Sequence, residues 1–307
     1  MAKIIAICNQ KGGVGKTTTA VNLASALAFF NRKTLLIDID PQGNATSGVG
    51  VDKHSLSKSI YTVLIEHSAI ADAVTATQFQ NLSIIPSNVD LTGFEIEVLD
   101  NPNKEYILRD IVSSIKSVYD YIIIDSPPSL GLITVNALTA ADSVLVPIQC
   151  EYYALEGLSQ LLSIISLVKK RINPGLAIEG VLLTMADYRT RLTTEVIEEV
   201  KRFFLSDEGI SLAGGRDKVY KTIIPRSIRL SEAPGFGKPI NIYDKNSIGA
   251  KQYLNLAREV LGENIPSEDL DPANIVSRQN FSVSADRGIQ DISKADISPG
   301  AGSQSII

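Results

Sequence analysis

A glycine-rich segment between an apolar run and a helical run constrains this chain more than any other feature. The apolar residues 3–9 precede it. The segment reads Lys11-Gly12-Gly13-Val14-Gly15-Lys16-Thr17-Thr18. Glycines in such a turn let backbone N–H groups point inward around phosphate oxygens, and the N-terminus of the following helix adds positive partial charge. A strand, a glycine turn and a helix in this order predict a phosphate-binding loop.

Two residues at the start of that helix would carry most of the chemistry. Lys16 would reach the β- and γ-phosphates, and the Thr17 hydroxyl would bind Mg²⁺. The usual pattern begins with a glycine five residues before Gly15, but this chain has Gln10 there and a second lysine, Lys11, directly after it. The alternative is a glycine turn that binds nothing. Folding alone gives no reason for Lys16-Thr17, because a lysine there is repelled by the helix N-terminus. We therefore expect all eight residues of the segment to contact ATP.

Short apolar runs alternate along the chain with longer runs of helical periodicity. This alternation is typical of a parallel sheet that is buried on both faces, with its ligand site at the carboxyl ends of the strands. We therefore predict an α/β fold of the P-loop NTPase type, a three-layer αβα sandwich around a mostly parallel, twisted sheet. The expected strands are 3–9, 34–38, 82–86, 121–125, 143–148 and 178–184, and the expected helices are 16–30, 106–118, 155–172 and 193–204.

Three aspartates stand at or just after the ends of expected strands. Asp38 and Asp40 point to the same side if the chain stays extended, so one can orient a water molecule while the other supports Mg²⁺. Asp125 ends an apolar run, as does the carboxylate that reaches Mg²⁺ in P-loop enzymes. Each acid alone could instead be solvated in a turn. Beside a phosphate loop, we expect a Mg²⁺ site of Thr17, Asp38 and Asp125.

These motifs together closely resemble the ParA/Soj family of DNA-partitioning ATPases, which carry a deviant Walker A motif. The resemblance extends from residue 3 to about residue 262 and is strongest to the Soj-like chromosomal branch. Besides the phosphate loop, it rests on Asp38-Ile39-Asp40-Pro41-Gln42-Gly43-Asn44-Ala45-Thr46, Asp125-Ser126-Pro127-Pro128-Ser129, Gln149-Cys150-Glu151-Tyr152-Tyr153-Ala154-Leu155-Glu156-Gly157, Ile224-Pro225-Arg226 and Arg229-Leu230-Ser231-Glu232-Ala233-Pro234.

The resemblance implies a catalytic set of Lys11, Lys16 and Asp40. Lys11 would reach across a nucleotide-sandwich dimer to the phosphates of the partner, much as an arginine finger does. Gly12 would have to be small because the partner's loop comes close to it. Asp40 would position the hydrolytic water.

The resemblance also implies binding residues in the C-terminal half. Adenine would lie near Thr184 and Pro225. The ATP-bound dimer would bind DNA without sequence specificity, through arginines that match Arg189, Arg226 and Arg229 by position. Residues 216–229 independently contain five basic residues and one acid, which suits phosphate contacts. The alternatives are a solvated charged face, internal salt bridges, or a role for Arg226 in the nucleotide pocket.

The family's activity gives the expected function. The chain would be a weak ATP hydrolase that binds ATP and Mg²⁺, dimerises, and then coats nucleoid DNA. A centromere-binding partner of the ParB/Spo0J type would stimulate hydrolysis and release the dimer, which makes a two-state switch. We expect a cytoplasmic, nucleoid-associated protein without membrane contact.

Charge, cysteine content and hydropathy bear on other classes of protein. The net charge of −5 argues mildly against an obligate nucleic-acid binder but leaves room for a local basic patch. Cys8 and Cys150 are too few and too far apart for a disulfide framework, and both lie in apolar runs, so we expect buried free thiols. No apolar stretch is long enough to span a bilayer, and no signal peptide is evident after Met1.

Two segments depart from the Soj-like pattern. We expect an ATPase domain over residues 1–263, with a surface-loop insertion at 205–215. We expect residues 264–307 to form a disordered tail, because they are rich in Ser, Asp, Pro and Gly and have no apolar periodicity.

Two further classes share the loop and stay open as alternatives, and an ATP-dependent metabolic ligase is a more distant third. MinD-type ATPases act at membranes in cell-division site selection and need a C-terminal amphipathic helix, which is not obvious in the tail. Reductases of the nitrogenase iron-protein type need cluster cysteines at the dimer face. An ATP-dependent metabolic ligase would turn over only with its small-molecule substrate.

Overall fold

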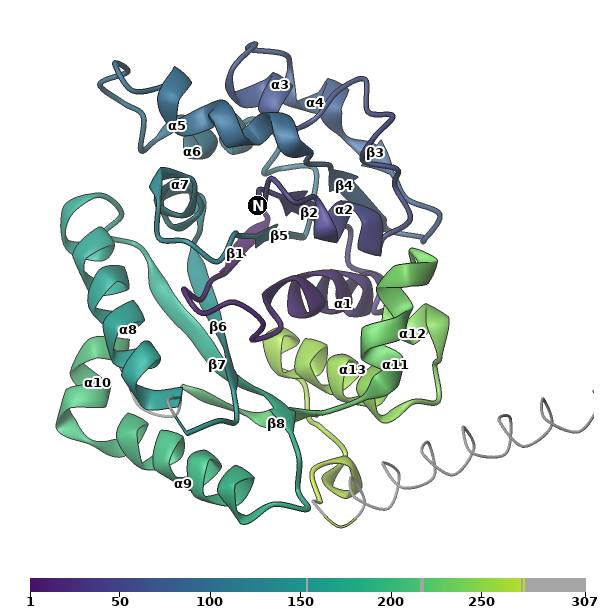
Figure 1. Ribbon diagram of the computed structural model, residues 1–307, viewed down its shortest axis with the longest axis vertical. Coiled ribbons are helices and arrows are strands. Elements are labelled where there is room, and N and C mark those ends of the chain that lie inside the picture. Colours follow the sequence, from purple (N-terminus) through teal and green to yellow (C-terminus); the bar gives the residue numbers. More distant parts are fainter. Residues whose placement is uncertain (153, 216–217, 272, 274–307) are drawn as a thin grey trace, which may run out of the picture.

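The computed structural model describes residues 1–152, 154–215, 218–271 and 273, and a single eight-stranded sheet runs through them (Figure 1). The strand order is β3-β4-β2-β5-β1-β6-β7-β8. All neighbouring strands are parallel except β3 and β4. The strands are β1 (Lys3–Ile7), β2 (Thr34–Asp38), β3 (Thr75–Ala76), β4 (Leu82–Ile85), β5 (Tyr121–Asp125), β6 (Ser143–Gln149), β7 (Ala177–Ala186) and β8 (Val219–Pro225). The predicted αβα fold is confirmed.

Helices cover both faces of the sheet. Their bounds are α1 (Lys16–Phe29), α2 (Asn44–Gly48), α3 (Ile60–Leu64), α4 (Ile70–Ala73), α5 (Phe94–Glu97), α6 (Ile107–Ser113), α7 (Leu132–Ala140), α8 (Ala154–Arg171), α9 (Arg191–Leu205), α10 (Asp207–Ala213), α11 (Ile228–Glu232), α12 (Ile240–Tyr243) and α13 (Ile248–Leu261). The short 3-10 turns are η1 (Val89–Gly93), η2 (Ala233–Phe236) and η3 (Ser267–Asp269).

Alternate side chains of each central strand enter two different cores. Ile5 and Ile7 of β1 pack with α1 and α13, whereas Ile4 and Ala6 pack with α6, α7 and α8. Figure 1 shows these two sets of helices on opposite sides of the sheet. A fully buried isoleucine contributes roughly 1.5–3 kcal/mol to stability. Two-sided burial is the reason that these strands are apolar at every position.

All six expected strands and all four expected helices are present, with ends that differ by a few residues. Two strands and several helices are additional. β8 was not expected because it is an edge strand with exposed polar positions such as Lys221. α13 begins where the Ser247 hydroxyl accepts a hydrogen bond from the Ala250 N–H and ends at Gly262, whose φ is 73°. Both features are sequence signals for a helix.

The expected surface loop at 205–215 is wrong, because α10 occupies most of it. Ser206 starts the helix by accepting a hydrogen bond from the Gly209 N–H, 3.2 Å away. Gly209 is inside the helix for a packing reason. A Cβ there would meet the Phe203 carbonyl oxygen at 2.0 Å, so only glycine lets α10 fold back on α9.

The expected disordered tail at 264–307 lies mostly outside the described residues. Residues 264–271 contain η3 and pack on α13, where Gln252 Nε2 donates to the Asp269 carbonyl oxygen at 2.9 Å. None of the helices within the described ranges combines the length and the apolar character required to cross a bilayer. Cys8 and Cys150 are buried free thiols, as predicted.

Candidate nucleotide-binding site

The phosphate loop joins β1 to α1 and has the backbone shape that its glycines predict. Gly13 and Gly15 have φ values of 75° and 88°, in the left-handed region that favours glycine. A Cβ built at Gly12 or Gly13 would have no other described atom within 4 Å. The loop therefore leaves an open cradle at the N-terminus of α1, as phosphate binding requires.

Lys16 points inside this loop. It is only 6% exposed, and its Nζ donates to the Lys11 carbonyl oxygen at 3.0 Å. Burial lowers the pKa of its ammonium group, while the charges of Asp125 and Asp40 oppose that shift. Lys16 therefore lies between the loop and the acidic strand ends, where a phosphate group would need a cation.

Lys11 has a different environment. Its Nζ forms an ion pair with Glu151 Oε2 at 2.8 Å, and both side chains are nearly half exposed. Its backbone N–H donates to Asn9 Oδ1, and Asn9 Nδ2 in turn donates to the Pro147 carbonyl oxygen. Asn9 thus fixes the start of the loop to β6, while the Lys11 side chain remains at the surface.

Asp125 is the acid that best fits a metal ion. It pairs in register with Ile7 of β1 and with Asp38 of β2, so three strand ends meet at this carboxylate. The residue is fully buried, and neither of its oxygens has a well-formed hydrogen bond within the described chain. Burial and the Asp38 charge raise its pKa well above the usual range, and the nearby Thr17 hydroxyl opposes this. A divalent cation at these oxygens would compensate the free-energy cost of burying a charged carboxylate.

Asp38 lies beside Asp125, but both of its carboxylate oxygens already accept hydrogen bonds. Oδ1 accepts the Asp40 N–H at 3.1 Å, and Oδ2 accepts both the N–H and the hydroxyl of Thr46 at 2.8 Å. Burial raises its pKa to about 6, and the Thr46 hydrogen bonds oppose the rise. Asp38 therefore anchors the start of α2, and Thr17 with Asp125 is the pair best suited to hold Mg²⁺ directly.

Asp40 stands at the rim of this acidic group. It is 6% exposed, and its Oδ1 accepts the Gln42 N–H at 2.9 Å. Its charge also acts on Lys16 and on Asp125. A buried carboxylate close to the phosphate lysine is in a position to orient a water molecule.

A pocket of about 400 Å³ opens beside the loop and suits a nucleoside. Its lining includes Thr18, Thr184, Pro225 and Tyr253, so both residues expected near adenine border it. Thr184 Oγ1 donates to the Val14 carbonyl oxygen at 2.9 Å, which ties the end of β7 to the loop. The next residue, Met185, lines the same pocket with a φ of 53°, a strained conformation typical of binding sites.

A family model described as an AAA domain matches residues 2–178. The Bacillus subtilis (strain 168) protein named sporulation initiation inhibitor protein Soj is 56% identical over 260 residues, which is 85% of this chain and 98% of that protein. The chain belongs to the ParA/Soj family of chromosome-partitioning ATPases.

One further relative agrees with ParA/Soj membership, and one solved structure shares the fold. The chromosome partitioning protein ParA of Myxococcus xanthus (strain DK1622) is 50% identical over 266 residues, covering 87% of this chain and 90% of that protein. The crystal structure of cobyrinic acid a,c-diamide synthase from Mycobacterium smegmatis, with bound ADP and magnesium, has a TM-score of 0.72 and 34% identity. It covers 87% of this chain and 98% of that one. The fold is thus shared between partitioning proteins and a synthase.

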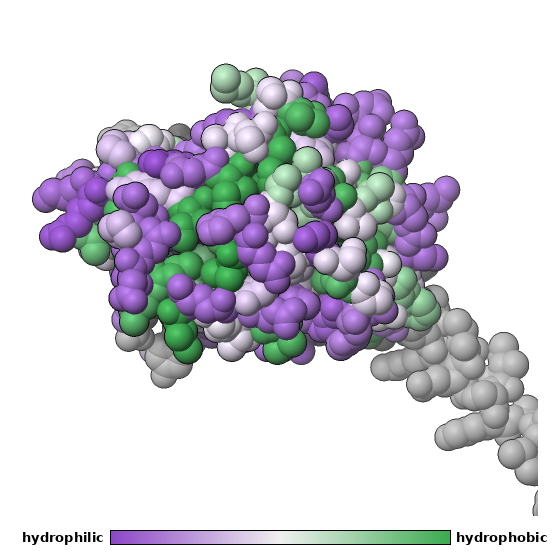
Figure 2. Space-filling model, turned by 90° about the horizontal axis from the view of Figure 1, so that it is seen from above, coloured by the Kyte–Doolittle hydropathy of each residue, from purple (hydrophilic) through white to green (hydrophobic). Residues whose placement is uncertain are grey.

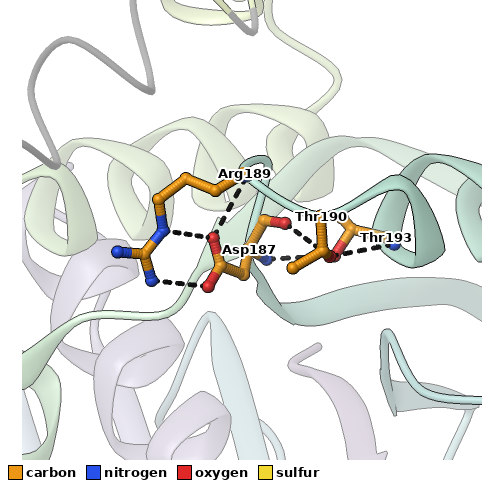
Figure 3. A network of polar contacts seen from close by, with 4 residues as sticks. All are labelled: Asp187, Arg189, Thr190 and Thr193. Atoms are coloured by element: carbon orange, nitrogen blue, oxygen red, sulfur yellow. Dashed lines mark hydrogen bonds and ion pairs between the residues drawn. The ribbon is translucent and has the colours of Figure 1, made fainter.

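The three arginines that the ParA/Soj resemblance suggests for DNA all lie near carboxylates. Arg189 is 67% exposed at its side chain, and its guanidinium forms two bonds to Asp187, at 2.7 Å and 2.6 Å (Figure 3). Asp187 also accepts the Arg189 N–H at 3.1 Å. The neighbouring Thr190 accepts a bond from the Thr193 N–H and starts α9. Arg189 is therefore exposed but already neutralised by its own chain.

Arg226 and Arg229 occupy different places. Arg226 borders the nucleoside pocket, and its charge adds slightly to the lowering of the Asp187 pKa that the Arg189 hydrogen bond mainly causes. Arg229, on α11, lies 3.0 Å from Glu232 and 3.8 Å from Asp244, with 29% of its side chain exposed. The structure thus pairs Arg189 with one carboxylate and Arg229 with two others, and it places Arg226 at the nucleoside pocket.

Sequence reasoning assigned no role to four residues that shape the site. They are Asn9, Thr46, Glu151 and Met185. Asn9 directly precedes the loop, and Thr46 and Glu151 stand in motif segments. Their closeness to these motifs could have marked them as site residues. Nothing in the sequence marks Met185, because its strained φ depends on how β7 meets the loop.

Proposed function

We propose that this chain is an ATP hydrolase of DNA segregation. It binds ATP and Mg²⁺, closes into a nucleotide-sandwich homodimer, and in that state binds DNA without sequence specificity. A partner of the ParB/Spo0J type stimulates its weak hydrolysis and so releases the dimer. Family membership supports the partitioning role, and the open phosphate cradle beside Thr17 and Asp125 supports Mg²⁺-dependent ATP binding.

The different environments of the two loop lysines carry the proposal. Lys16 is buried and bonded within its own loop, so it serves the phosphates of its own chain. The Lys11 ammonium lies at the surface and pairs with Glu151. A flexible cation that is nearly half exposed next to a phosphate site is suited to act on a second protomer, as a trans cation does in other P-loop enzymes.

Gly12 supports the same assembly. Its φ is not in the left-handed region, and a Cβ there would touch no other described atom. The fold of one chain therefore gives no reason for a glycine at this position. Close approach of a second protomer or of its nucleotide would give one.

The residues of the site divide the chemistry between them. Lys16 and the loop N–H groups bind the phosphates, and Thr17 with Asp125 would hold Mg²⁺, which neutralises phosphate charge when bound. Asp40 holds the attacking water and takes up its proton. The ATPase domain spans residues 1–263, and its dimer works on nucleoid DNA in the cytoplasm.

One experiment tests the whole proposal. DNA co-sedimentation is measured with ATP, with ADP and without nucleotide, on wild type and on Lys11→Ala. We expect binding only for wild type with ATP, and in parallel a dimer by sedimentation velocity. Wild-type DNA binding that ignores nucleotide would refute the switch. ATP-dependent pelleting with anionic liposomes instead of DNA would favour a MinD-like membrane role.

A further inference from the structure

The side of the molecule farthest from α13 carries an apolar patch that its own chain does not cover. Figure 2 looks onto the side formed by α3, α5 and α6 and shows a band of apolar residues between hydrophilic ones. Ile96 and Leu99 are 79% and 64% exposed, although Phe94 and Val98 on the other side of the same turn are buried. Val89 at the start of the adjoining η1 is 70% exposed. We call Val89, Ile96 and Leu99 the α5 patch.

The charge around the α5 patch is mainly negative, although Lys104 at its edge donates from Nζ to the Leu99 carbonyl oxygen at 2.8 Å. Between Lys58 and Lys104 the sequence contains six acidic residues and neither lysine nor arginine. Four of the six, Asp90, Glu95, Glu97 and Asp100, stand in or beside η1 and α5, and all four are exposed. An apolar surface with an acidic rim is complementary to a segment with an apolar face and basic flanks.

Some of these acids are gathered from separate parts of the chain. Both Glu97 oxygens accept from the Tyr61 hydroxyl of α3, at 3.1 Å and 3.2 Å. Gly93 makes room for that contact, because a Cβ there would meet Glu97 Oε1 at 2.6 Å. The hydrogen bond to Glu97 raises the pKa of Tyr61, and Glu66 and Asp90 act in the same direction, so these acids lie near one hydroxyl.

Two hydrogen-bond paths join the patch to the nucleotide site. Glu95 Oε1 accepts the Leu132 N–H at 2.7 Å, at the end of the loop that begins after Asp125. Gly131 permits this contact, because a Cβ there would lie 2.3 Å from the same oxygen. On the η1 side, the Ser87 N–H donates to Thr46 Oγ1 at 2.9 Å, and that hydroxyl donates to Asp38.

We propose that the α5 patch is the docking surface for a basic amphipathic helix of a partner protein, and that Glu95 couples its occupancy to the loop between Asp125 and α7. The apolar side chains supply the buried contact, and the acidic rim selects the basic flanks and their orientation. The inference deepens the proposed function, because it gives partner-stimulated hydrolysis a location, but docking itself requires no ATP turnover.

The probe is a labelled helical peptide of about 18 residues, with leucines at i, i+3, i+4 and i+7 and lysines on both flanks. Fluorescence anisotropy measures its binding to the full chain. We expect the Ile96→Ser/Leu99→Ser variant to lose about tenfold or more in affinity. The matched control is Phe29→Ser/Ile228→Ser, because these residues are 62% and 56% exposed elsewhere on the surface, and it should bind as wild type does.

Three results would overturn the docking proposal. The first is equal binding by wild type and the Ile96/Leu99 variant. The second is equal binding of a peptide in which glutamates replace the lysines. The third is a nucleotide-independent dimer that only the Ile96/Leu99 variant loses, because the patch would then serve a second copy of this chain.

Hydrogen exchange tests the coupling. Peptide binding should slow amide exchange in residues 126–132 of wild type, and Glu95→Ala, at peptide concentrations that saturate it despite one lost rim charge, should lose that protection. Equal protection in both proteins would overturn the role of Glu95. All variants are also tested for binding of a fluorescent ATP analogue. If wild type fails that test but binds the peptide, the proposed ATPase function fails and the docking surface stands.

Discussion

The Nζ atom of Lys11 lies 2.8 Å from Oε2 of Glu151, so a carboxylate of its own chain holds the lysine proposed to act on a second protomer. Glu151 also accepts a hydrogen bond from Gln149 Nε2. Lys11 must exchange this contact for phosphate oxygens when two protomers close over ATP. The cost is small, because exposed ion pairs contribute about 1 kcal/mol or less.

Glu151→Gln tests that exchange. We expect unchanged ATP affinity and ATP-dependent dimerisation that is tighter by no more than about 30-fold, since closure breaks one weak exposed pair in each of the two protomers. Sedimentation velocity with a non-hydrolysable ATP analogue measures the dimerisation. A strong loss of dimer would mean that Glu151 is itself part of the dimer interface and does more than hold Lys11.

Gly12→Val separates folding from assembly. Because no described atom surrounds a Cβ at Gly12, the variant should unfold at the same urea concentration as wild type and bind ATP, but it should not dimerise. Gly13→Val is the matched control, since a φ of 75° makes it costly by about 1–2 kcal/mol. A normal dimer of the Gly12 variant would remove Gly12 from the interface.

Asp40→Ala tests the position of the water. We expect hydrolysis to decrease about 100-fold or more, while ATP binding stays intact and a DNA-bound dimer accumulates. Phosphate release and DNA co-sedimentation in ATP measure the two effects. A variant that hydrolyses ATP normally, or one that stays monomeric with ATP, would contradict the role of Asp40.

The buried carboxyl of Asp38 predicts a pH dependence of stability. Its folded pKa is about 6 because of burial, against about 3.9 in an unfolded chain. The folded state thus holds this proton more tightly. The free energy of unfolding should therefore decrease as the pH rises from about 4 to about 6, by an amount on the order of 3 kcal/mol.

Urea titrations without nucleotide, at several pH values, measure this effect on wild type and on Asp38→Asn. The variant should lose the part of the decrease that Asp38 causes, whereas the part that the burial of Asp125 causes should remain. The lowered pKa of Asp187, due mainly to its hydrogen bond from Arg189, acts in the opposite direction in both proteins. Parallel pH profiles would show that Asp38 is not the group responsible.

Arg229→Glu tests the DNA surface. We expect DNA affinity to fall about tenfold or more. The slope of log affinity against log salt concentration should become shallower by the equivalent of about one phosphate contact per site. ATP-dependent dimerisation should persist. Arg109→Glu is a matched control, because Arg109 is exposed and pairs with Asp110 at 2.8 Å on the distant α6. If the control loses as much affinity, net charge rather than a local site explains DNA binding.

The central sheet was the most predictable part of the fold. Strands such as β5, with three consecutive isoleucines before Asp125, are buried on both faces, so hydrophobicity alone reveals them. β8 failed this criterion because an edge strand mixes exposed and buried positions. The wrong prediction of a loop at 205–215 has another cause. Gly209 lies inside a helix because a Cβ at this position would clash with the carbonyl oxygen of Phe203.

The sequence by itself determined the nucleotide site, because the local order of strand, glycine turn and helix places Lys16 and Thr17 without help from distant residues. It also determined that Asp125 meets the loop, since the carboxyl ends of parallel strands share one edge. Only the tertiary structure decided where the loop lysines point, what engages Asp38, and that the α5 patch is joined through Glu95 to the Asp125 loop. These relationships depend on contacts between residues that are far apart in the chain, and no local pattern encodes such contacts.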